Sequence, residues 1–78
     1  MDPNLAILTQ VASDILGRYD LELTPETRIS TVKGWDSVAL VKILLTLETQ
    51  LGVEFETYDI PNIQTVGDVV KMMEKAQA

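Results

Sequence analysis

The chain contains neither cysteine nor histidine in its 78 residues. Without cysteine it has no disulfide framework and no thiol nucleophile. Without histidine it also lacks the commonest general base, and the two absences together remove the commonest zinc ligands. Most enzyme classes need at least one of these groups. We therefore expect a protein that is not an enzyme, with no catalytic residue of its own and no metal site.

Long hydrophobic runs and basic residues are also scarce. No apolar run approaches the roughly 18 residues that suggest a membrane span, and the chain begins without the basic segment of a signal peptide. We expect a cytoplasmic protein without a membrane span. Six basic residues against 12 acidic ones give a net charge of −6, which repels nucleic acid and attracts basic protein surfaces. Solubility alone explains such a charge equally well.

Length and composition indicate one soluble domain over 1–78. Independent domains rarely fall much below about 50 residues, so a second domain does not fit. The chain is 46% hydrophobic and 23% charged, as in globular proteins that fold unaided. A core of this size supplies roughly 3–5 kcal/mol of net stability, which favours carrying or binding over an enclosed active site. We expect a monomer.

Hydrophobic periodicity predicts an all-α fold with three main helices, over 3–16, over 37–51 and from Val66 onward. A single helical turn at 59–62 precedes the last helix. Residues 18–36 show no periodicity and are predicted to form a long loop between the first two helices. Apolar side chains are expected to hold this loop on the core, namely Leu21, Leu23, Ile29 and Val32.

The helix ends carry their own sequence signals. Pro3 suits the first helical position, where no amide donor is needed, and Gly17 and Gly52 suit the left-handed stop after a helix. Thr65 followed three residues later by Asp68 resembles a capping box. These signals support the predicted helix boundaries.

The helix over 37–51 has the widest apolar face, so we expect it to be central in the bundle. The side chains expected to face inward are Val38, Val41, Leu44, Leu45, Leu47 and Leu51. Those left mainly for solvent are Lys42, Thr46, Glu48, Thr49 and Gln50.

The segment Gly34-Trp35-Asp36-Ser37-Val38 lies where the long loop meets the central helix. Gly34 allows a sharp turn, and Ser37 then sits at the helix start, where free amides and the helix dipole favour a phosphodiester by about 0.3–1 kcal/mol. An Asp-Ser pair at a helix start is also an ordinary cap. The complete pattern of glycine, any residue, aspartate, serine and an aliphatic residue is much rarer than the pair.

Further stretches accompany this pattern, at 23–27, 40–41, 47–48, 51–55 and 63–68. Together they make the chain resemble the acyl carrier protein family, including the peptidyl carrier proteins, over nearly its whole length. The resemblance implies a small four-helix carrier bundle. It also implies that a phosphopantetheinyl transferase attaches 4'-phosphopantetheine from coenzyme A to Ser37, while Asp36 positions magnesium and phosphate groups. Gly34, Asp36 and Ser37 are thus the expected cofactor site.

The partner surface departs from that of fatty-acid carriers. Ala39 and Lys42 stand where such carriers often have acidic residues, which favours a specialised set of partners. Val38, Ala39, Lys42 and Glu48 are the candidate contacts, although a solvated helix face explains Lys42 and Glu48 equally well. Trp35 is either an exposed interface anchor or a side chain packed on the core.

The resemblance implies a freestanding carrier of acyl or aminoacyl thioesters. Its pathway would be fatty-acid-like, polyketide or nonribosomal peptide biosynthesis, and a D-alanyl cargo is a further possibility. A loading ligase or acyltransferase and downstream biosynthetic enzymes would then act on it. An acyl chain sheltered within the bundle would be lined by Val41, Leu45, Leu47, Phe55 and Ile63, which are otherwise core residues. The alternative is an unmodified helical interaction module with the same fold.

Overall fold

The computed structural model describes residues 2–78, which form three main helices and two short 3-10 helices. These elements are α1 (Pro3–Leu16), η1 (Ile29–Thr31), α2 (Ser37–Leu51), η2 (Thr57–Asn62) and α3 (Val66–Gln77). The described residues contain no β-strand, only an isolated bridge between Arg28 and Thr65. None of their helices has the length and hydropathy needed to cross a bilayer. The predicted all-α fold is confirmed.

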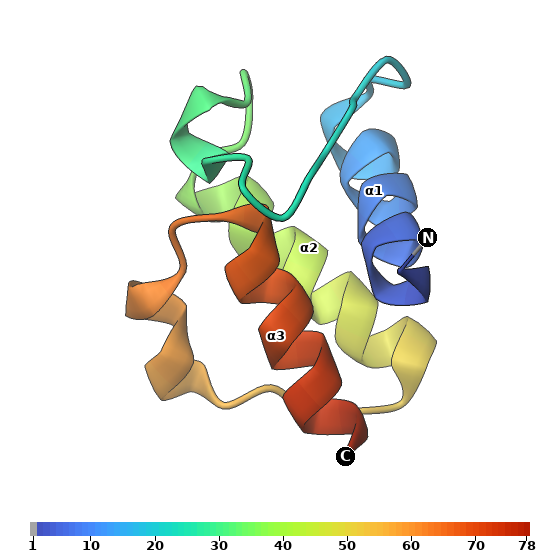
Figure 1. Ribbon diagram of the computed structural model, residues 1–78, viewed down its shortest axis with the longest axis vertical. Coiled ribbons are helices and arrows are strands. Elements are labelled where there is room, and N and C mark those ends of the chain that lie inside the picture. The colour runs from blue at the N-terminus through green and yellow to red at the C-terminus, as the bar shows by residue number, and fades with distance from the viewer. Residues whose placement is uncertain (1) are drawn as a thin grey trace.

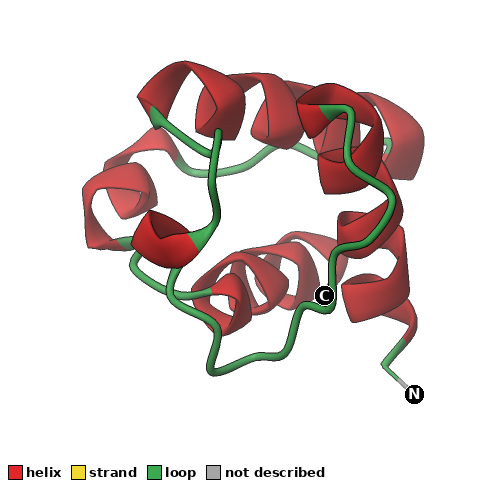
Figure 2. Ribbon diagram, turned by 90° about the horizontal axis from the view of Figure 1, so that it is seen from above, coloured by secondary structure: helices red, strands yellow, loops and turns green. Residues whose placement is uncertain are grey.

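The three main helices pack around one core. α3 lies in front of α2, and α1 stands beside them, in contact with both (Figure 1). Seen from above, the described residues form only helices and the loops that join them (Figure 2). The Asn4 and Gln77 side-chain amides exchange two hydrogen bonds of 3.0 Å, which join the start of α1 to the end of α3.

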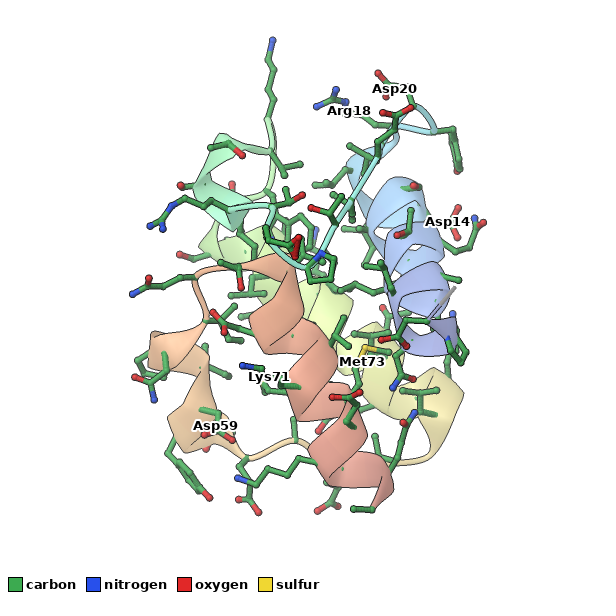
Figure 3. The ribbon with its side chains drawn as sticks, in the orientation of Figure 1. Asp14, Arg18, Asp20, Asp59, Lys71 and Met73 are labelled. Carbon is green, nitrogen blue, oxygen red and sulfur yellow. The ribbon has the colours of Figure 1, made fainter. Side chains whose placement is uncertain are left out.

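The core draws side chains from all three helices. Met73 of α3 reaches into the interior, whereas Lys71 projects from α3 on another side (Figure 3). The largest fully buried side chains are Leu8, Val11, Ile43, Leu47, Val66, Val69 and Met73. Because apolar burial is the main favourable contribution to folding, these contacts between helices hold the bundle together.

The inward face of α2 differs from the predicted one. Val38, Val41 and Leu45 were expected in the core, but their side chains are 62%, 46% and 57% exposed. The buried residues of the helix are Ala39, Ile43, Leu44 and Leu47. The prediction was wrong because apolar residues surround nearly the whole of α2, so periodicity alone does not select the face that packs against α1 and α3.

The long loop is tied to the start of α3 by backbone hydrogen bonds. The Ile29 amide donates to the Gln64 carbonyl over 3.0 Å, and the Val66 amide donates to the Thr27 carbonyl over 2.9 Å. Ile29 is buried, and the other three predicted apolar contacts, Leu21, Leu23 and Val32, are half-buried against the core. The expected attachment of the loop is confirmed, while η1 within it was not predicted.

Gly67 brings α3 into close contact with the loop at Pro25. Its amide donates to the Pro25 carbonyl over 2.9 Å, and a Cβ on Gly67 would lie 2.7 Å from that oxygen. Although alanine is the better helix former, the clash with backbone must move the loop. We expect Gly67→Ala to lower the free energy of unfolding by about 1–3 kcal/mol, measured by urea denaturation. The exposed control Lys71→Ala should change it by less than about 0.5 kcal/mol, and equal effects would contradict the close contact.

Asp68 forms the predicted capping box with Thr65. One Asp68 carboxylate oxygen accepts hydrogen bonds from the Gln64 and Thr65 amides at 2.9 and 3.0 Å, while the Thr65 hydroxyl accepts from the Asp68 amide at 3.2 Å. The hydrogen bonds from the Gln64 and Thr65 amides hold the pKa of Asp68 below its ordinary value of 3.8. The charged carboxylate therefore stabilises the fold above about pH 4, and this contribution is lost as pH falls through the lowered pKa.

This linkage gives a prediction for Asp68→Asn. Wild type should be more stable than the variant at neutral pH. The difference should shrink as pH falls from about 4 through the lowered pKa of Asp68, because below that pKa both residues are uncharged in the folded protein. Urea midpoints measured from pH 7 down to pH 2.5 would check it. The matched control is Glu74→Gln, an exposed carboxylate on the same helix. A stability difference independent of pH would contradict the assigned role of the charge.

Candidate functional site

A sharp turn before α2 sets the position of Ser37. Gly34 has a backbone φ of +89°, in the left-handed region that favours glycine, and its carbonyl accepts the Asp36 amide over 3.1 Å. The nearest atom to a Cβ on Gly34 would be 3.8 Å away, in Leu16, so space is not the constraint. The glycine is needed here for its backbone conformation.

Asp36 caps α2, and Ser37 is the first residue of that helix. One Asp36 carboxylate oxygen accepts the Ala39 amide over 2.8 Å. The Ser37 side chain is exposed, so its hydroxyl is accessible from solvent beside the first turn of α2. The helix dipole is positive at this end and favours a negatively charged group attached to the hydroxyl.

Two surface hollows flank Ser37. The larger one, of about 340 Å³, is bounded by residues 28–30, 35–37, Leu40, Ile63 and Gln64. Its volume falls within the range of small-molecule sites, which is about 300–1,000 Å³. The second, of about 270 Å³, lies between α1 and α2, where Asp36 and Lys42 reach its wall. Ser37 therefore lies at the edge of a concave surface.

Trp35 lies in the wall of the larger hollow and is only 5% exposed. The interpretation of Trp35 as an exposed interface anchor is therefore corrected, and the alternative of packing on the core holds. Trp35 belongs to the cluster of buried side chains that forms the core. Its Nε1 is buried, and no acceptor among residues 2–78 lies within hydrogen-bonding distance. An unsatisfied buried donor typically costs about 1–3 kcal/mol.

Two of the candidate partner contacts are less accessible than expected. Ala39 is only 7% exposed and lines the second hollow together with Ile15 and Leu16 of α1, so it is much less accessible than expected. Glu48 is half-buried, and its carboxylate accepts the Phe55 amide over 2.7 Å. This bond fixes the chain after α2 and gives Glu48 a structural role that the sequence did not reveal.

The exposed residues of α2 include an apolar strip with one positive charge. Val38 and Lys42 are exposed as expected, and Val41 and Leu45 join them. Their spacing was visible in the sequence, but it was attributed to the core. The same exposure separates Val41 and Leu45 from fully buried Leu47.

The residues around Ser37 fit a phosphopantetheine group. The exposed hydroxyl can carry the phosphate, and the adjoining hollow presents Ile29, Leu40 and Ile63 to an apolar group. Trp35 also lines this hollow, and its buried Nε1 is a donor without a hydrogen-bond partner among residues 2–78. When bound, this group would supply the thiol that the cysteine-free chain lacks.

Comparison with known proteins agrees with this fit. The family described as "Phosphopantetheine attachment site" matches residues 6–73. An acyl carrier protein of Thermotoga maritima is 34% identical over 65 residues, which cover 83% of this chain and 80% of the relative.

The fold is likewise that of a known carrier. The solution structure of holo acyl carrier protein from Geobacter metallireducens matches with a TM-score of 0.87 at 24% identity, covering 97% of this chain and 87% of the other. The family match spans most of the chain, and the curated relative exceeds 30% identity. The chain therefore belongs to the acyl carrier protein family, whose members carry acyl groups on a 4'-phosphopantetheine prosthetic group.

Proposed function

We propose that Ser37 is the attachment point of the phosphopantetheine arm and that the arm's thiol carries an acyl or aminoacyl group as a thioester. The observation that supports this most is the exposure of Ser37 at the start of α2, beside a hollow of about 340 Å³. A phosphopantetheinyl transferase would join the Ser37 oxygen to the phosphate of the arm. The remainder of coenzyme A, adenosine 3',5'-bisphosphate, leaves, and the serine proton passes to a base of the transferase.

Asp36 would assist this attachment while it caps α2. Its carboxylate oxygen Oδ1 is held by the Ala39 amide, and no hydrogen bond to Oδ2 is formed within residues 2–78. A free carboxylate oxygen beside Ser37 suits magnesium, which prefers oxygen ligands. Proteins usually supply only one or two carboxylates to this ion. The remaining ligands would be phosphate oxygens of coenzyme A and groups of the transferase. Magnesium is thus a requirement of the modification and not a resident metal.

Intact mass after incubation with coenzyme A, magnesium and a broad-specificity phosphopantetheinyl transferase tests the proposal. We expect the protein to gain the mass of one phosphopantetheine group. A chain that folds but gains no mass under conditions that modify another acyl carrier protein would support the alternative, an unmodified helical interaction module.

The partner surface supports a specialised pathway rather than general fatty-acid synthesis. Exposed Val38, Val41, Lys42 and Leu45 form an apolar strip with one positive charge on α2. Such a strip would bind a partner through shape complementarity and apolar contacts more than through electrostatic attraction by acidic residues. We propose polyketide, fatty-acid-like or nonribosomal peptide enzymes as the partners, including the ligase or acyltransferase that loads the arm.

The transferase itself provides a defined partner with which to test this strip. We expect Val41→Asp to lower kcat/KM for phosphopantetheinylation by about tenfold, the effect of losing a moderate interface contact. Tyr58→Asp, at an exposed aromatic residue of η2, is the control and should change it less than threefold, roughly the effect of a peripheral contact. Equal rates for both variants and wild type would contradict docking through the strip.

A further inference from the structure

Trp35 carries the buried side-chain nitrogen without a hydrogen-bond partner in residues 2–78. Indole has a single polar atom, which can only donate, so no other atom of the side chain compensates for the missing acceptor. Buried polar groups in folded proteins nearly always have partners, and an exception calls for a physical reason. The position of the ring, two residues before Ser37, suggests one.

The hollow beside Ser37 joins the two residues. Trp35 and Ser37 both line it, together with apolar Ile29, Leu40 and Ile63. A group attached to the Ser37 oxygen therefore begins at the rim of this hollow. The phosphopantetheine arm suits such walls, because methyl and methylene groups alternate along it with two amide groups.

We propose that the Trp35 indole N–H donates a hydrogen bond to an amide carbonyl oxygen of the phosphopantetheine arm when the arm lies in this hollow. The inference rests on the proposed attachment at Ser37. A neutral carbonyl is the acceptor that fits, because a neutral group loses little hydration free energy when it moves from water to a buried donor. The charged phosphate would lose much more, and it stays hydrated at the exposed serine.

The contact requires a small rearrangement. Nε1 is covered in the structure, so the arm must displace a side chain or the ring must turn. Arg28, Ser30 and Gln64 bound the hollow and are themselves exposed, so they can move without disturbing the core. The arm would thus be held near the bundle while it waits for a partner, and a partner that extracts it must break one hydrogen bond.

Nuclear magnetic resonance of the ¹⁵N-labelled protein tests the inference. Trp35 is the only tryptophan, so the indole N–H gives a single cross-peak. On attachment of the arm we expect its proton to move downfield and its exchange with D₂O to slow by about tenfold, the factor for a hydrogen bond of typical net strength. Ser37→Ala treated in the same way is the control and should show neither change.

A single-atom replacement separates the donor from the shape of the ring. Tryptophan can be replaced throughout the chain by β-(benzothiophen-3-yl)alanine, which has sulfur in place of the N–H and changes only position 35. With a ¹³C-labelled arm, we expect a carbonyl resonance of the arm to differ between wild type and this variant. The mass spectrum is recorded on the same samples.

These readouts distinguish the two proposals. A chain that gains no arm contradicts the attachment at Ser37, whatever the indole does. An arm that is attached while the indole proton, its exchange and the arm carbonyls stay unchanged overturns the inference about Trp35 and leaves the attachment intact. Should the indole signal change while the carbonyls of the wild type and the variant agree, the hydrogen bond is also overturned.

Discussion

Ser37→Ala should gain no phosphopantetheine under conditions in which the wild-type protein is fully modified. The substitution removes the single oxygen that can form the phosphodiester at this position, so the expected loss is complete and not partial. The fold should survive, because Ser37 is exposed and the cap of α2 is supplied by Asp36, whose bond to the Ala39 amide remains. Intact mass measures the modification, and circular dichroism verifies the helices.

Ser30→Ala is the matched control for this experiment. Ser30 is exposed and lines the same hollow as Ser37, but it lies in η1 and not at the start of a long helix. We expect Ser30→Ala to be modified as fast as wild type. Modification of Ser37→Ala, or loss of modification in Ser30→Ala alone, would place the attachment at another hydroxyl.

Leu47→Ala should unfold much of the protein. Leu47 is fully buried, and replacing a buried leucine by alanine typically costs about 2–5 kcal/mol. That loss is comparable with the roughly 3–5 kcal/mol that a core of this size supplies. Leu45 lies two residues away on the same helix, but its side chain is exposed. We therefore expect Leu45→Ala to change the free energy of unfolding by less than about 0.5 kcal/mol.

Urea denaturation followed by circular dichroism compares the two leucine variants. If Leu47→Ala does not fold at all, Ile43→Val at another fully buried position should still give a measurable loss of about 0.5–1.5 kcal/mol. A larger loss in Leu45→Ala than in Leu47→Ala would contradict the observed packing, in which α2 buries Leu47 and exposes Leu45.

Helix boundaries were predictable because their signals are local. The first two helices begin and end at the predicted residues, since aspartate caps and glycine stops act within one turn of the chain. The capping box at Thr65 was also confirmed. The turn before α3 is longer than predicted, because it begins at Thr57 rather than Asp59, and it ends at Asn62 as predicted.

Long-range packing was not predictable from the same signals. The burial of Trp35 and Ala39 depends on where α1 and the loop lie, which no local pattern specifies. The sequence predicts Glu48 only as a charge near the helix surface. Its carboxylate accepts the Phe55 amide, and this hydrogen bond depends on the path of the chain seven residues later. Ser37 was identified correctly as a helix start, since that property is fixed by the residues on either side of it.

The hydrogen bond from the Ile29 amide to the Gln64 carbonyl joins two walls of the hollow beside Ser37, because both residues line it. Any breathing motion that widens the hollow along this direction must stretch that bond. The exchange rate of the Ile29 amide proton would then follow the fraction of time that the hollow is open. A longer cargo that enters the bundle should accelerate this exchange. The exchange rate of one backbone amide would therefore report how far the cargo penetrates.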